Sequence, residues 1–181
     1  MTVPTDVELI QQVASGDARA LDELMRRHEQ MVFAVCLRIM GTRDTALDAV
    51  QETFLTVFRK ADRFHAEAKF STWLYRVATN TCFDLLRKAK RRRAEPLPEH
   101  HDPVDVHTVN DLESVELRPS IEDALQAISP DYRAAVVLSD IHGLAIEEIS
   151  EALEIPAGTV KSRVFRGRRQ LAEILGNIRE H

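Results

Sequence analysis

The sequence has few of the features that mark secreted or membrane proteins. Only two cysteines, Cys36 and Cys82, occur among 181 residues, which is too few for a disulfide framework and fits a reducing compartment. No apolar run approaches the roughly 18 residues that a membrane-spanning helix needs. The N-terminal residues lack a basic stretch followed by an apolar one, so we expect no secretory signal. These absences predict a cytoplasmic protein without a membrane segment.

Residues that interrupt helices are also scarce, and the prolines are concentrated in one place. The chain has six glycines, seven prolines and 44% hydrophobic residues, a composition that predicts a mainly helical globular protein. Helical periodicity fails over residues 94–118, where prolines alternate with acids, as in an extended linker. We therefore predict an all-α fold: an N-terminal helical bundle over residues 1–93, an acidic flexible linker over 94–118, and a C-terminal helix-turn-helix domain over 119–181.

Arrangements typical of enzymes are missing as well. The sequence shows no Ser/His/Asp or Cys/His pattern and no phosphate-binding glycine loop, so an enzyme acting on nucleic acid has little support and we expect no cofactor. One run in the linker combines possible metal ligands: His100, His101, Asp102, Asp105 and His107. Because a linker has no rigid element to fix ligand geometry, we interpret this run as linker composition and predict no metal.

The charge is acidic overall but unevenly distributed. The formal net charge is −5, yet residues 1–93 hold 16 Lys and Arg against 12 Asp and Glu. The segment from Lys161 to Gln170 contains five cations and no acid. Because the local field, and not the sum, decides binding to phosphates, both ends of the chain are compatible with nucleic-acid binding.

Residues 70–93 form the most informative predicted helix, which Ser71 or Thr72 can cap. At helical spacing one face is an ordinary core stripe of Leu74, Val77, Ala78, Thr81 and Leu85. The other face carries Trp73, Arg76, Asn80, Phe83, Arg87 and Arg91. Cations that hold phosphates beside rings that stack on unpaired bases suit single-stranded nucleic acid. The alternative is a solvated basic face whose two rings pack into a neighbouring helix.

The helix predicted over residues 42–60 has an acidic face. Its buried side is expected to consist of Leu47, Val50, Phe54 and Val57. The opposite side carries Asp44, Asp48, Gln51 and Glu52, with no basic partner in the same stripe. Such a face is either solvated or a docking surface for a basic partner.

The C-terminal part predicts a helix-turn-helix. A short helix over residues 145–153 and a turn over 154–158 precede a basic helix from Thr159, its expected cap, to Leu175. The start of that helix would enter a major groove. Ser162 and Arg166 are then candidates for base edges, and the other cations, Lys161, Arg163, Arg168 and Arg169, for phosphates. The alternative is a three-helix bundle with a basic face.

Three motifs in this order resemble those of extracytoplasmic-function (ECF) sigma factors, in the sigma-70 family. They are Asp44–Phe54 (DTALDAVQETF), Phe70–Asn80 (FSTWLYRVATN), and Gly158–Arg163 (GTVKSR) followed by Arg166–Arg169 (RGRR). The resemblance covers nearly the whole chain. It implies two helical domains that bind core RNA polymerase and direct it to promoter DNA.

The resemblance also implies roles for individual residues. The acidic helix would bind the beta-prime clamp helices through Asp44, Asp48, Gln51 and Glu52. The −10 element would be read and melted by residues 62–90, with Phe64, Trp73, Arg76, Asn80 and Arg87 in contact. The −35 element would be read by Thr159, Lys161, Ser162, Phe165, Arg166 and Arg169. The outer surface of the same domain would rest on the beta flap, and an anti-sigma factor is an expected partner.

Some residues depart from the family's pattern. Ala145 stands where relatives commonly have Ser or Thr, so a helix cap is lost; Gly167 lies inside a helix, where close packing would explain it. Cys36 and Cys82 are either a redox pair or two small buried residues. The alternative to a sigma factor is a free-standing helix-turn-helix regulator whose N-terminal domain senses a ligand or dimerises.

Overall fold

The structure is a computed structural model that describes residues 3–65, 67, 69–94 and 120–176. Every regular element in these ranges is helical. None of the helices in them is long and apolar enough to cross a membrane. Nearly all of the predicted linker, including the run from His100 to His107, lies outside the described residues.

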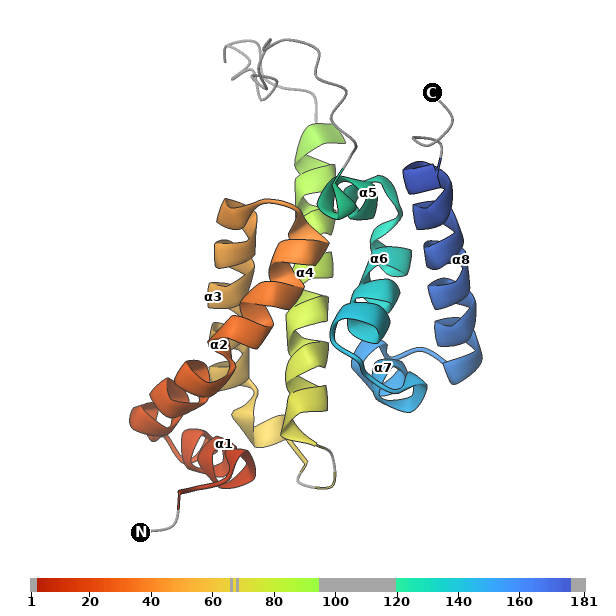
Figure 1. Cartoon of the computed structure of the whole chain (residues 1–181). Helices are drawn as coiled ribbons and strands as arrows, with labels where there is room; N and C mark the ends of the chain where they lie inside the picture. The colour runs from red at the N-terminus through yellow and green to blue at the C-terminus, as the bar shows by residue number, and fades with distance from the viewer. Residues whose placement is uncertain (1–2, 66, 68, 95–119, 177–181) are drawn as a thin grey trace, which may run out of the picture.

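Four α-helices form the N-terminal bundle: α1 (Asp6–Ala14), α2 (Ala18–Met40), α3 (Arg43–Arg59) and α4 (Phe70–Ala94), with a short 3-10 turn, η1 (Ala61–Arg63), after α3 (Figure 1). The starts of α1, α2 and α3 are capped by local side chains, because the first N–H groups of a helix lack helical partners. Thr5 accepts from the backbone N–H of Glu8 at 3.2 Å, and Asp17 accepts from Arg19 at 2.9 Å. Gly41, with φ of 90°, ends α2 in the left-handed conformation that glycine favours.

The core of the bundle consists of the apolar stripes of these helices. Leu74 and Ala78 of α4 are fully buried, and Val77 and Thr81 nearly so, as predicted. The start of α4 differs from the prediction, because the helix begins at Phe70 and Ser71 and Thr72 lie within its first turn. Neither is therefore its N-terminal cap.

The C-terminal part contains α5 (Ile121–Ala127), α6 (Pro130–Val136), a π-helical turn η2 (Val137–Ile141), α7 (Ile146–Leu153) and α8 (Ala157–Gly176). Ser120 and Asp123 form the predicted capping box, and Pro130 occupies the first turn of α6. Ala145 supplies no side-chain cap to α7, as predicted, but its N–H still donates to Glu148 at 3.0 Å.

Helices α7 and α8, with the turn between them, make the predicted helix-turn-helix. The second helix begins at Ala157, so Thr159 lies inside its first turn and is not its cap, contrary to the prediction. Gly167 packs α8 closely against α6, because a Cβ placed there would lie 2.6 Å from Cγ2 of Val136. This contact bears out the expected reason for a glycine at that position.

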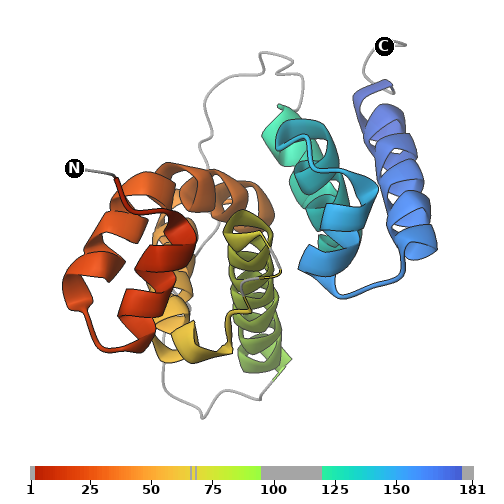
Figure 2. The same cartoon turned by 90° about the horizontal axis from the view of Figure 1, so that it is seen from below.

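The two helical groups pack against each other. Figures 1 and 2 show α4 between the other N-terminal helices and the C-terminal group, and α4 contacts α7 while α5 and α6 lie on the end of α2. Arg133, only 5% exposed, donates to the carbonyl oxygen of Ile39. Gln126 Nε2 donates to the carbonyl of Arg38 at 2.8 Å. The carbonyl groups at the end of α2, which lack helical partners, are thus satisfied by side chains from the other domain.

Candidate nucleic-acid interface

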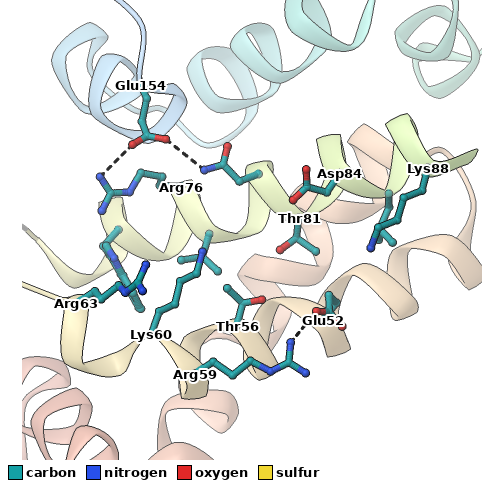
Figure 3. A pocket seen from close by; sticks show the side chains of 14 residues that line it. Glu52, Thr56, Arg59, Lys60, Arg63, Arg76, Thr81, Asp84, Lys88 and Glu154 are labelled. Atoms are coloured by element: carbon teal, nitrogen blue, oxygen red, sulfur yellow. Dashed lines mark hydrogen bonds and ion pairs between the residues drawn. The ribbon is translucent and has the colours of Figure 1, made fainter. Parts of the chain in front are cut away.

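A groove of about 510 Å³ lies between α3, η1 and α4 (Figure 3). Five cations line it: Arg59, Lys60, Arg63, Arg76 and Lys88. Three acids face them, Glu52, Asp84 and Glu154, so the groove is basic on balance. Amide and hydroxyl groups lie between the charges, among them Asn80 and Thr56. A groove of this kind offers both positive charge and hydrogen-bonding groups to an anionic chain.

Trp73 is packed in a cluster of aromatic rings. The ring is only 6% exposed, and it packs edge-on against Phe64 and at a tilt on Phe70, with centroid distances of 5.5 and 5.9 Å. Its residual surface lines the groove. For Trp73 the burial agrees with the alternative interpretation, in which the ring packs inward, because Phe64 before α4 and Phe70 at its start supply ring partners. Phe64 is half-buried in the same cluster.

The predicted basic face of α4 divides into two. Arg76 and Asn80 lie together in the groove. Arg87 instead pairs with Asp84 and, with Phe83, lines a second depression against Pro130 of α6. The structure therefore does not bring Arg87 and Phe83 to the site of Arg76 and Asn80. The reason is distance along the helix, because Arg87 lies seven residues beyond Asn80, about 10 Å further along α4, where the helix runs beside α6.

Several groove residues were missed from the sequence. Arg59 and Lys60 end α3, and Arg63 follows in η1, so all three reach the groove from the side opposite α4. The sequence signal was the spacing of three cations around a helix end. That signal alone does not say which neighbouring helix the cations face.

The outer face of α3 is exposed and mixed in character. Asp44, Asp48 and Gln51 are exposed as predicted. Three apolar side chains share the helix surface with them: Leu47 (46% exposed), Leu55 (41%) and Phe58 (48%). Leu47 was predicted to be buried, and that prediction is wrong.

Glu52 points away from this outer face. It is half-buried, lines the groove and pairs with Arg59 at 3.2 Å. Its predicted place among the free acids is therefore not supported by its position.

The start of α8 presents a polar and basic surface. Lys161, Ser162, Phe165, Arg166 and Arg169 are exposed, and Thr159 is half-buried.

Two further arginines of α8 are held within the domain. Arg163 pairs with Asp131 at 3.1 Å, and Arg168 donates twice to Asp140. The hydrogen bonds from Arg168 lower the pKa of Asp140. Arg169 also pairs, with Glu173 at 3.4 Å, so in the described structure each of these three arginines has an acidic partner on the same domain.

The two cysteines are free and buried, Cys36 on α2 and Cys82 on α4. A hydrogen bond with the Cys36 thiol, together with burial, raises the pKa of Cys82, which keeps that thiol protonated. Within the described ranges no group of His, Cys, Asp or Glu side chains could hold a metal ion.

Both helical groups of the chain are similar to known proteins. Residues 24–92 match the family described as Sigma-70 region 2, and residues 118–171 match Sigma-70, region 4. The ECF RNA polymerase sigma factor SigM of Mycobacterium tuberculosis is 36% identical over 175 residues, which cover 96% of this chain and 86% of SigM. SigE of Mycolicibacterium smegmatis, also an ECF sigma factor, is 40% identical over 168 residues; the match covers 90% of this chain and 65% of SigE.

The fold is also similar to that of solved structures. The structure of CnrH in complex with the cytosolic domain of CnrY has a TM-score of 0.67 and 25% identity, covering 95% of this chain and 97% of CnrH. The sigma factor RpoE of Bartonella quintana, solved with the anti-sigma factor NepR, shares the fold with a TM-score of 0.66, 24% identity, and coverage of 86% and 96%. The chain therefore belongs to the ECF sigma factors of the sigma-70 family.

Proposed function

We propose that the chain binds core RNA polymerase and directs it to promoters, with α8 reading the −35 duplex and the α3–α4 groove holding an unpaired −10 strand. The observation that carries this proposal is the basic groove beside the exposed acidic and apolar face of α3. The N-terminal residues 1–93 and the C-terminal residues 119–181 are the two functional units, joined by the linker. Membership of the family supports the overall activity, whereas the roles of single residues are inferred from where each residue lies in the structure.

The groove suits a single strand better than a duplex. Arg59, Lys60 and Arg63 lie along one wall and Arg76 on the other, so phosphates would be contacted from both sides. The Asn80 amide both donates and accepts, which suits a base edge. Extruding a base from a duplex costs a few kcal/mol, and contacts to the extruded base repay that cost. Trp73 and Phe64 would support the groove from beneath, with only the edge of Trp73 available to a base.

The outer face of α3 suits a basic helical partner. Exposed apolar side chains at Leu47, Leu55 and Phe58 can be buried at the centre of a contact. Asp44 and Asp48 would orient a basic partner at the rim. We assign this face to the clamp helices of the beta-prime subunit, with Gln51 between the acids. Glu52 is not assigned to this contact, because it lines the groove.

The exposed residues of α8 suit a major groove. Ser162 and Arg166 would meet base edges, and Phe165 would contact a thymine methyl group. Lys161 and Arg169 would meet phosphates, and Thr159 lies where the start of the helix would approach the backbone. The remaining surface of this domain would rest on the beta flap.

A second protein partner is also proposed. CnrH was solved in complex with the cytosolic domain of CnrY, which supports a protein partner that binds this fold. We propose that an anti-sigma factor binds the chain and holds it inactive.

The test of polymerase binding is a pull-down with purified core enzyme. Reversing two charges on α3 (Asp44→Lys with Asp48→Lys) should abolish retention of the chain by the enzyme. The matched control reverses two exposed acids of α2, Asp22→Lys with Glu29→Lys, and should be retained like the wild type. Equal retention of all three proteins would contradict the assignment and favour a free-standing regulator.

A further inference from the structure

The aromatic cluster that borders the groove also contacts one polar side chain of α2. The ring of His28 lies against Phe70, with a centroid distance of 5.3 Å and an angle of 56° between the ring planes. Phe70 in turn packs on Trp73, with a centroid distance of 5.9 Å, and the remaining surface of Trp73 lines the groove. His28 does not line the groove itself but lies two ring contacts away from it.

An acidic side chain of α1 holds the His28 ring in place. Nε2 of His28 lies 2.8 Å from Oδ2 of Asp6, and the two side chains are 16% and 29% exposed. Because an ionised carboxylate only accepts hydrogen bonds, Nε2 is the donor. The other oxygen of Asp6 accepts from Nη1 of Arg27 at 2.9 Å. With both of its oxygens engaged, the Asp6 carboxylate is fixed, and it fixes the rotation of the His28 ring.

Helix α1, which carries Asp6, is attached to the bundle by further contacts. Arg27 of α2 also donates to the carbonyl oxygen of Pro4 at 2.9 Å, just before α1. The apolar side of α1 is buried against the bundle, with Leu9, Ile10 and Val13. Figure 1 shows α1 at the end of the bundle where α4 begins, and α1 contacts both α2 and η1 there. The hydrogen bond from His28 to Asp6 therefore ties the aromatic cluster to a packed helix.

A hydrogen-bonding side chain is not needed merely to fill the space beside Phe70. Leucine or methionine would bury apolar surface there without a polar group to satisfy. Histidine adds orientation, because its ring is flat and its bond to Asp6 restricts the angle of that ring. Aromatic pairs depend on this angle, since the edge and the face of a ring carry opposite partial charges. The arrangement therefore suits the placement of Phe70 as well as its burial.

We propose that His28 is a positioning residue for the strand groove, with Asp6 of α1 as its support. Through Phe70 it fixes Trp73, and with it the part of the groove surface that Trp73 offers to an unpaired base. The proposal rests on the strand-binding role of the groove given above. It adds that α1, none of whose residues lines the groove, contributes to strand affinity. Loss of the His28 ring leaves the groove cations in place, so strand binding weakens without loss of positive charge from the groove.

The first experiment uses the fluorescence of Trp73, which is the only tryptophan of the chain. His28→Gln keeps a donor for Asp6 but removes the ring that touches Phe70. Arg27→Gln is the matched control, because it removes three hydrogen bonds that hold α1 and α2 but leaves His28 unchanged. Quenching of Trp73 by acrylamide should rise with His28→Gln and stay at the wild-type value with Arg27→Gln. No rise with His28→Gln, or an equal rise in both variants, would overturn the proposal.

The second experiment measures strand binding by fluorescence anisotropy, with the full chain and a labelled single-stranded DNA of mixed sequence. A contact between aromatic rings is worth roughly twofold to tenfold in an equilibrium constant, so His28→Gln should weaken strand binding by about that factor. Arg27→Gln should keep the wild-type affinity. A duplex of the same sequence should bind all three proteins equally. If His28→Gln weakens duplex and strand binding alike, the effect is general damage to the fold, and the positioning role is refuted.

Asp6→Ala tests the support of the ring without changing the aromatic cluster. It should weaken strand binding on its own, because the His28 ring is then no longer held. Added to His28→Gln it should have no further effect on strand affinity, because the ring through which Asp6 acts is already absent. Additive losses in the double variant would show that Asp6 and His28 act independently, and they would contradict the coupling of α1 to the groove.

A further variant separates this proposal from the role of the groove. Arg59→Ala with Arg63→Ala removes two cations that line the groove. If these substitutions weaken strand binding while His28→Gln does not, the groove binds strands and the positioning role is wrong. If Arg59→Ala with Arg63→Ala has no effect, the proposed function of the groove fails, and the positioning role fails with it.

Discussion

Two glycines on the same helix should respond in opposite ways to substitution by alanine. In an ordinary helix the change from glycine to alanine stabilises by up to about 1 kcal/mol, because alanine restricts the unfolded chain. At Gly158 nothing lies within 4 Å of the added Cβ, so Gly158→Ala should raise the free energy of unfolding by about 0.5 kcal/mol.

At Gly167 the added Cβ of alanine would overlap neighbouring atoms of α6. The added Cβ would lie 2.6 Å from Cγ2 of Val136 and 3.3 Å from the carbonyl oxygen of Tyr132. Valine is stiff at χ1 and the carbonyl belongs to the backbone, so neither can move aside easily. Overpacking of this kind costs about 1–3 kcal/mol, which offsets the helix gain and leaves a net loss of up to about 2 kcal/mol.

Urea denaturation followed by circular dichroism measures both variants. Adding Val136→Ala to Gly167→Ala should recover part of the loss that the overlap causes, whereas adding it to Gly158→Ala should only destabilise further. If Gly167→Ala is as stable as Gly158→Ala, α8 does not pack on α6 as closely as described.

Three more predictions concern the reading helix and the domain contact. Arg166→Ala should relax the base preference of −35 duplex binding. Arg169→Ala should mainly reduce, by about one, the slope of log affinity against log salt concentration. Identical behaviour of both variants in titrations across salt concentrations would mean that another face of α8 lies in the major groove. Glu154→Gly should be more stable than Glu154→Gln by about 1 kcal/mol in urea denaturation, because both lose the carboxylate but only glycine relieves the left-handed backbone; equal stabilities would exclude strain there. Burial, with a smaller effect of Arg38, lowers the pKa of His142, so the folded state favours the neutral ring. The stability that the neutral ring contributes is complete above the ordinary pKa of about 6.5 and is lost as the pH falls below it. His142 bonds to Tyr75 of α4 at 3.2 Å across the domain contact. His142→Gln should therefore flatten, between about pH 7 and 5, the pH dependence of the interdomain distance that pulsed electron paramagnetic resonance measures between spin labels on α2 and α8. An unchanged profile would assign the dependence to other groups.

Most helix boundaries followed from local signals in the sequence. Asp17, Gly41, Ser120 and Pro130 act where their backbone preferences predict. The two misplaced helix starts, at Phe70 and Ala157, each lie one or two residues before a Ser or Thr that could have been a cap. A hydroxyl residue in the first turn satisfies the same sequence pattern as one at the cap, so the pattern alone could not distinguish them.

The candidate site was only partly predictable, because burial depends on packing between distant segments. Periodicity placed Trp73 with Arg76 and Asn80 on one side of α4, but it could not show that Phe64 and Phe70 would cover the ring. It also placed Leu47 in the core, although α3 turns that residue outward. Glu154 and its partners on α4 are more than 70 residues apart in the sequence, so no local sequence pattern predicts their contact.

If the groove of α3 and α4 holds an unpaired −10 strand during initiation, permanganate footprinting of promoter DNA with core polymerase will show it. Trp73→Ala is a poor probe, because removing a buried ring costs about 3–5 kcal/mol of stability. Arg76→Ala with Asn80→Ala leaves the core intact. Arg87→Ala, about two turns further along α4 and outside the groove lining, is the matched control. Thymine reactivity in the −10 element should be lost with the first variant and kept with the control. Undiminished reactivity with Arg76→Ala and Asn80→Ala would contradict it.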